Sequence, residues 1–175
     1  EHDPLASSIL ITNDRALAEH TLNEVQCQLE SLPRKDIAGV SIEKNGRIIV
    51  TENMEQAIHL ANISGPEHVE LLLRDPFHIL PQIRCAGAVF IGEYSPEPLG
   101  DYFAGPNHVL PTGGTARFYS VLNVETFMKR TSIISYTQKA LEDVSDDIIR
   151  LAETEGLEAH ARAIRMRRGG NAELS

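Results

Sequence analysis

The chain has 175 residues and a formal net charge of −9, with 42% apolar and 23% charged residues. This length suits one compact domain with a small appendage, and the composition is that of a globular protein rather than a disordered one. The acidic balance argues against nonspecific nucleic-acid binding, which requires a basic surface. No apolar run approaches the ~20 residues of a membrane-spanning helix, so we expect a soluble protein with no membrane association.

The two cysteines, Cys27 and Cys85, are too few for a disulfide framework, which favours a reducing, cytoplasmic location. A metal site in this chain would have to use imidazole and carboxylate ligands rather than a set of thiolates. The sequence opens on Glu1-His2-Asp3-Pro4, without an initiator methionine or a signal segment. We therefore interpret the chain as the later part of a longer protein.

Short apolar runs alternate with helical patterns in the first half of the chain. This alternation predicts an α/β layer with a parallel sheet and helices on both faces, in which sites gather at the carboxyl ends of the strands. Asn45-Gly46 lies between two of the expected strands and could form a hairpin turn. The expected strands are residues 7–12, 38–42, 47–51, 69–73 and 86–91, and the expected helices run from the Asn13-Asp14 cap to Pro33, over 53–61 and over 76–83.

The second half begins with residues 92–114, a stretch rich in proline and glycine. Loops of this length in compact domains are commonly functional. Beyond it we expect a strand over 131–137, a helix over 138–154, an interruption at Gly156 and a last helical stretch over 157–167. The arginines at the end of that stretch are expected to face solvent or an acidic partner.

Two pairs of residues are candidates for chemistry. Glu67-His68 joins a carboxylate to an imidazole that exchanges protons near neutral pH, at the start of an expected strand. Asp101 and His108 lie in the proline-rich stretch, where they could bind zinc or orient a substrate. Each pair also has an ordinary structural interpretation, as surface groups, a helix cap or local packing. By spacing alone, neither His2 nor His160 has the local pattern of a metal ligand.

Several segments resemble, in order, the characteristic blocks of the histidinol dehydrogenase family. Gly65–Leu71 resembles its Pro-Glu-His block, and Gly100–Phe118 resembles its longest block almost position by position. The opening EHDP and the later TSIISYT and EGLEAHARAIRMR resemble three further blocks. The resemblance covers essentially the whole chain.

The resemblance implies a zinc- and NAD-dependent enzyme that oxidises L-histidinol to L-histidine through the aldehyde, the last step of histidine biosynthesis. It implies that Glu67 and His68 are the catalytic acid/base pair. The implied zinc ligands in this chain are His2, Asp101 and His160, joined by a glutamine that precedes them in the family. The implied substrate contacts are His2, His68, Asp101, His108, Glu155 and His160.

The resemblance also implies an incomplete Rossmann-like catalytic domain over residues 1–122. Residues 123–175 would form a mainly helical tail that completes the active site of the neighbouring subunit in a homodimer. NAD would be bound mainly by the missing front part, so the fragment alone is expected to be inactive. Two other hypotheses are a metal-dependent hydrolase that uses Glu67 and His68 to activate water, and a non-catalytic dimerisation fragment.

Overall fold

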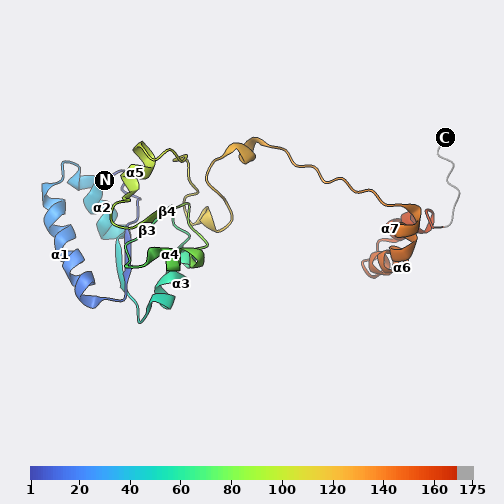
Figure 1. Ribbon diagram of the computed structural model, residues 1–175, viewed down its shortest axis with the longest axis horizontal. Coiled ribbons are helices and arrows are strands. Elements are labelled where there is room, and N and C mark those ends of the chain that lie inside the picture. The colour runs from blue at the N-terminus through green and yellow to red at the C-terminus, as the bar shows by residue number, and fades with distance from the viewer. Residues whose placement is uncertain (169–175) are drawn as a thin grey trace. The chain divides into compact units, whose positions relative to one another are not determined.

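A computed structural model describes residues 1–168 of the chain. The chain divides into two compact units, the first spanning Glu1–Phe127 and the second beginning at Met128 (Figure 1). The first unit carries all four β-strands of the described residues and the second carries two helices. The expectation of an α/β architecture with short parallel strands is confirmed at this level.

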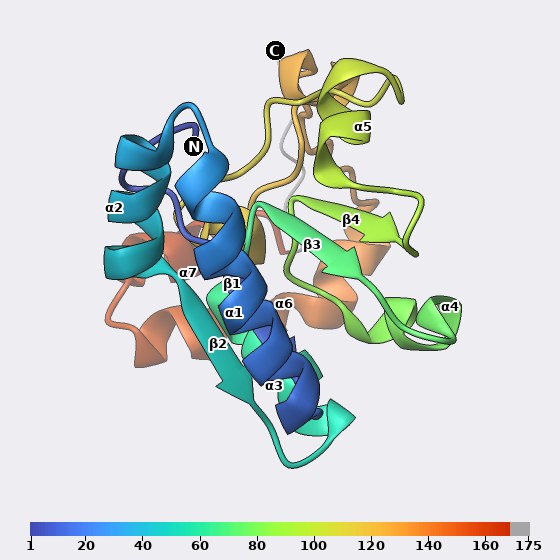
Figure 2. The same cartoon turned by 90° about the vertical axis from the view of Figure 1, so that its left-hand side faces the viewer.

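The first unit begins with a parallel strand pair. Strand β1 (Ile9–Thr12) is followed by helix α1 (Arg15–Ser31), helix α2 (Lys35–Asn45), strand β2 (Arg47–Val50) and helix α3 (Met54–Ser64). The Asp14 carboxylate accepts a hydrogen bond from the Leu17 N–H and so caps α1, as predicted. Both α1 and α3 contact β1, and Figure 2 shows α1 in front of the β1–β2 pair with α3 behind it.

The expected strand over 38–42 and the hairpin at Asn45-Gly46 are both wrong. Residues 38–42 lie within α2, where Ala38 and Ser41 face inwards three residues apart, as on one side of a helix. Gly46 has φ −64°, not the positive φ of a hairpin turn, and its N–H donates to carbonyls in the last turn of α2. The strand that follows pairs in parallel with β1 instead.

The second strand pair carries the predicted chemistry. Strand β3 (His68–Leu71) is followed by helix α4 (Pro76–Ile79), a 3₁₀ turn (Leu80–Gln82), strand β4 (Ala88–Ile91) and helix α5 (Glu97–Tyr102). β3 and β4 are parallel, with His68 opposite Ala88. The strands expected near 69–73 and 86–91 and the helix expected at 76–83 are therefore confirmed, with shorter bounds.

Residues 92–114 are not a continuous loop, because α5 forms within them. Pro96 and Pro98 stand at the beginning of this helix, where a proline loses no intrahelical hydrogen bond. Further along, two short 3₁₀ turns cover Thr115–Arg117 and Val124–Phe127.

The second unit is a pair of helices, α6 (Gln138–Thr154) and α7 (Glu158–Arg165), as the sequence predicts. The Thr137 hydroxyl accepts from the Ala140 N–H at the start of α6. Gly156 takes a left-handed φ of 73° between the two helices, which a side chain would disfavour. The helices pack through small residues, since Ser145 and Ala161 are fully buried.

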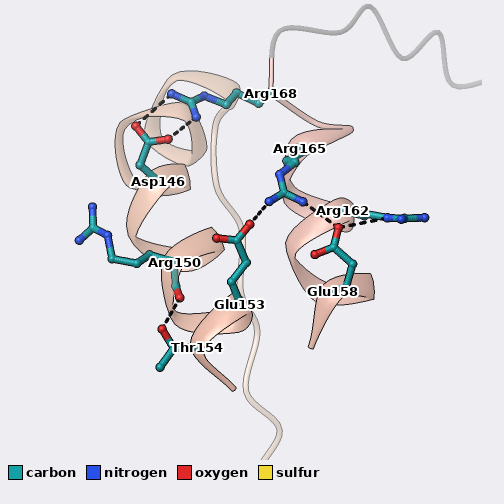
Figure 3. A network of polar contacts seen from close by, with 8 residues as sticks. All are labelled: Asp146, Arg150, Glu153, Thr154, Glu158, Arg162, Arg165 and Arg168. Atoms are coloured by element: carbon teal, nitrogen blue, oxygen red, sulfur yellow. Dashed lines mark hydrogen bonds and ion pairs between the residues drawn. The ribbon is translucent and has the colours of Figure 1, made fainter. Parts of the chain in front are cut away.

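Ion pairs connect α6 with α7 and with the residues that follow α7 (Figure 3). Arg165 pairs with both Glu153 of α6 and Glu158 of α7, and Arg168 pairs with Asp146 of α6. Both arginines are exposed, as the sequence predicts, and they also pair with carboxylates of the same unit. Because these salt bridges are exposed to solvent, each contributes little to stability.

The strand expected over 131–137 does not form in the described residues. These residues have no regular structure, and Ile133 and Ile134 are 92% and 83% exposed. A strand requires a hydrogen-bonded neighbour, and the strand pairs among residues 1–168 are β1–β2 and β3–β4. Among the helices of residues 1–168, none combines the length and the apolar composition that a membrane-spanning helix needs.

Candidate functional site

The Glu67-His68 pair lies where the loop enters β3, as the sequence predicts. His68 is the first residue of the strand, and the carbonyl of Glu67 accepts a hydrogen bond of 2.8 Å from the N–H of Ala88. This bond belongs to the ladder between β3 and β4, so the backbone of the pair is fixed by the sheet. The side chain of His68 is 26% exposed, but its Nε2 is buried and has no hydrogen-bond partner in the described part of the chain.

Helix α5 brings two carboxyl groups to this imidazole. Glu97 and Asp101 are four residues apart and so project from the same side of the helix. Oε1 of Glu97 lies 4.0 Å from Nε2 of His68, which is an ion-pair distance but too long for a hydrogen bond. Within residues 1–168, one potential metal-ligand atom from each of His68, Glu97 and Asp101 lies within 4.8 Å of the other two.

The two carboxyl groups affect each other electrostatically. Burial raises the pKa of Glu97 above its ordinary value of 4.5, and the hydrogen bond and charge of Asp101 raise it further, whereas His68 lowers it. Two carboxyl groups this close resist being ionised together unless a proton or a cation lies between them. The arrangement can hold a divalent cation or retain a proton.

A cavity of about 320 Å³ opens beside this cluster. Its wall includes Phe90 and the rest of β4, and its polar groups include Asp101 and His108. The ring of Phe90 also contacts the imidazole of His68, with centroids 5.8 Å apart. An apolar wall with a few convergent polar groups is the usual form of a small-molecule site.

Two glycines allow the backbone to approach closely around the site. A Cβ on Gly87 would lie 2.5 Å from the carbonyl oxygen of Glu67, and a Cβ on Gly100 would lie 2.6 Å from the ring of Phe90. Gly87 therefore lets the loop before β4 run alongside Glu67. Gly100 lets α5 rest on β4, which places Asp101 at the cavity.

The remaining predicted site residues lie elsewhere in the chain. His2 is an exposed residue of the segment before β1. Glu155 ends α6, and His160 is an exposed residue of α7 in the second unit. The first unit thus brings Asp101 together with His68 and with His108, while the assignment of His2, Asp101 and His160 to one zinc ion stays a prediction.

Sequence reasoning missed Glu97 and Glu70. Oε1 of Glu70, on β3, accepts a hydrogen bond of 2.9 Å from the N–H of Glu97. The signals were present, because Glu70 follows His68 by two residues and so shares its side of the strand. The prolines at 96 and 98 mark a helix start that would have placed Glu97 one turn before Asp101.

Comparisons with known proteins agree with the resemblance in the sequence. The profile of the family described as histidinol dehydrogenase matches residues 1–168. The chain is 58% identical over 167 residues to the histidinol dehydrogenase of Bacillus licheniformis and 53% identical to that of Caldanaerobacter subterraneus subsp. tengcongensis. In both cases the match covers 95% of this chain and 39% of the relative.

A solved structure is also similar. The crystal structure of histidinol dehydrogenase from Elizabethkingia anophelis matches with a TM-score of 0.75 and 37% sequence identity, over 95% of this chain and 38% of that chain. The present chain therefore spans about 39% of the length of the curated relatives that it matches. Since the family profile extends over all the described residues, the chain belongs to the histidinol dehydrogenase family.

Proposed function

We propose that this chain forms the acid/base and metal-binding part of an enzyme that oxidises L-histidinol to L-histidine by way of the aldehyde. The observation that carries the proposal is the cluster of His68, Glu97 and Asp101 beside the β4 cavity, in a chain that matches the family from residue 1 to 168. An oxidation of this kind requires removal of a proton from the alcohol and, in the second half, from water. Two adjacent proton-transfer groups meet that requirement.

His68 is the base that takes the alcohol proton in this proposal. Its buried Nε2 has no hydrogen-bond partner among residues 1–168, so a hydrogen bond from a bound substrate would satisfy it. The ring of Phe90 packs against the imidazole and limits its orientation. Glu67 removes a proton from the water that hydrates the aldehyde, which prepares the second oxidation. The ladder between β3 and β4 fixes the backbone of both residues, which supports a role in which they act on one substrate carbon.

Zinc is the metal that we propose for this site, with His2, Asp101 and His160 as its ligands from this chain. Asp101 fits such a site, because its carboxylate lies within 4.8 Å of the carboxylate of Glu97 and a positive ion beside them would reduce their mutual repulsion. When bound, zinc supplies a Lewis-acidic centre that fixes the substrate. His108, on the wall of the same cavity, and Glu155 then contact the substrate.

NAD is the proposed oxidant, and it would be bound mainly by parts of the protein outside this chain. The parallel strand pairs with their helices would belong to an incomplete Rossmann-like sheet, with residues 1–122 in the catalytic domain and 123–175 in the tail. Because the chain spans about 39% of its relatives, we expect turnover only from the full-length protein. We place that protein in the cytoplasm, where the free thiols of Cys27 and Cys85 would persist.

The proposed partner is a second copy of the protein, with the tail completing the neighbouring active site. Support comes from exposed apolar side chains at the end of the first unit and near the start of the second. Phe127, Ile133 and Ile134 are 79%, 92% and 83% exposed, more than a stable monomer leaves in one stretch. A subunit interface would bury these side chains.

The test is the reaction of the full-length protein with L-histidinol and NAD. We expect NADH to form, seen by its absorbance, with two NADH for each L-histidine produced. A metal-dependent hydrolase would use the same Glu67-His68 pair without NAD, so L-histidine methyl ester serves as the comparison substrate. Release of histidine from the ester with no NADH from histidinol would overturn the proposal in favour of hydrolysis.

A further inference from the structure

Glu70 lies on the same strand as the proposed base. Residues two apart on a strand point to the same face, so the side chains of His68 and Glu70 both leave β3 on one side. Helix α5 begins over that side, since its first residue, Glu97, contacts both of them. Glu70 is exposed and does not contribute to the apolar core.

The beginning of α5 depends on Glu70 for its cap. The residue before the helix is Pro96, and no side chain at that position accepts a hydrogen bond from the first turn. Oε1 of Glu70 takes this role from another element, with a hydrogen bond of 2.9 Å from the N–H of Glu97. A carboxylate is favoured there because the first N–H groups of a helix have no intrahelical partner and carry partial positive charge.

This hydrogen bond fixes the position of Glu97 relative to His68. Because the backbone N–H of Glu97 is held by β3, its carboxyl group stays 4.0 Å from Nε2 of the imidazole on the same strand. The far end of α5 is held separately, where Gly100 packs against the ring of Phe90. Loss of the Glu70 contact would therefore release the first turn of α5 while Asp101 keeps its place.

We propose that Glu70 is a positioning residue for the reaction: its carboxylate holds the first turn of α5 so that the carboxyl group of Glu97 stays beside the imidazole of His68. The inference rests on the proposed function, in which His68 is the base. Glu70 acts through the N–H of Glu97 and not on the substrate. A group that only accepts this hydrogen bond should thus replace it, whether or not that group is charged.

The experiment compares variants of the full-length, zinc-loaded protein in the NADH assay with L-histidinol. Glu70→Ala removes the acceptor, and we expect kcat to fall about tenfold, with the KM for histidinol and the zinc content unchanged. Glu70→Gln keeps an acceptor oxygen at the same length, and its kcat should stay within about threefold of the parent. Glu93→Ala, at an exposed glutamate of the turn before α5, is the matched control and should leave kcat unchanged.

Hydrogen exchange at the Glu97 amide gives a second readout that does not depend on activity. This amide should exchange faster in Glu70→Ala than in the parent. In Glu70→Gln it should exchange at the parental rate. The positioning role alone would be overturned if Glu70→Ala kept the parental kcat or the parental protection of the Glu97 amide. It would also be overturned if the kcat of Glu70→Gln were as low as that of Glu70→Ala. A parent protein that forms no NADH would instead overturn the proposed function, and this inference with it.

Discussion

Oε1 of Glu97 lies 4.0 Å from Nε2 of His68, although one residue begins helix α5 and the other begins strand β3. The two meet because α5 packs against the neighbouring strand, β4, through Gly100. The geometry of the site therefore depends on how closely a six-residue helix can approach a sheet, and this dependence can be tested by substitution.

Gly100→Ala should displace α5. The added Cβ would lie 2.6 Å from the ring of Phe90, and overpacking of this kind costs about 1–3 kcal/mol of stability. Urea unfolding followed by circular dichroism measures the loss, and turnover of the full-length protein should fall with it. Gly39→Ala, in helix α2, is the matched control, because its Cβ would lie 3.9 Å from Cδ2 of Leu29 in α1, an ordinary contact distance. That variant should be neutral or more stable by about 0.5–1 kcal/mol, and equal behaviour of the two variants would contradict the packing argument.

His68→Asn should remove the base and leave the metal in place. Turnover of the full-length protein should fall by a factor of ~10²–10⁴, the usual effect of losing an acid/base group. Zinc content, measured by atomic absorption, should match the parent. The control is His59→Asn, an exposed histidine on α3 with no assigned role, which should keep parental turnover. A His68→Asn variant that retains most of its activity would mean that another group is the base.

Asp101→Asn and His160→Asn should each weaken zinc retention. Either change removes a proposed ligand while preserving approximate size, so we expect at least about a tenfold higher zinc dissociation constant. Zinc remaining after dialysis against a chelator gives the measurement, with His20→Asn on the exposed surface of α1 as the control. Parental zinc affinity in the His160 variant would exclude that histidine from the ligand set.

Acid should destabilise helix α7, in which Glu158 and its two arginine partners all lie. The hydrogen bond and charge of Arg162, with the charge of Arg165, hold the pKa of Glu158 below its ordinary value. A group with a lowered folded-state pKa stabilises the fold above its unfolded pKa, and this contribution is lost as the pH falls through the folded pKa. Thermal unfolding between pH 7 and pH 3 should show a smaller fall in midpoint for Glu158→Gln than for the parent.

The control for this measurement is Glu142→Gln on α6. The Glu142 carboxylate accepts a hydrogen bond from the neutral amide of Gln138, so its substitution should leave the parental pH dependence. Identical pH dependence in the parent and Glu158→Gln would contradict a contribution from the arginines.

Much of the fold could be predicted from local signals. Asp14, Asn53 and Thr137 cap the helices that follow them, and short apolar runs mark β1, β3 and β4. The errors arose where a local pattern suited two structures. Residues 38–42 are apolar enough for a strand, but they form part of helix α2, in which the buried Ala38 and Ser41 have the spacing of one helix side. Residues 131–137 have the composition of a strand, but pairing depends on a neighbour that sequence composition does not specify.

The candidate site was predictable only where its residues are adjacent or carry the family's pattern. Glu67 and His68 stand side by side, and Asp101 and His108 share a distinctive segment. Glu70 and Glu97 lie on different elements, and the hydrogen bond between them in the structure shows that they act together. Contacts of this kind depend on the distance between two elements, which in this case is set by Gly100 and the ring of Phe90.

The most direct test locates the zinc ion in crystals of the full-length protein by anomalous diffraction at the zinc edge. We expect one strong peak at Asp101, with His2 and His160 as ligands from this chain and with His68 free to move a proton. A peak held instead by His68, Glu97 and Asp101, the three residues that the first unit gathers, would contradict the assignment of His68 as the base.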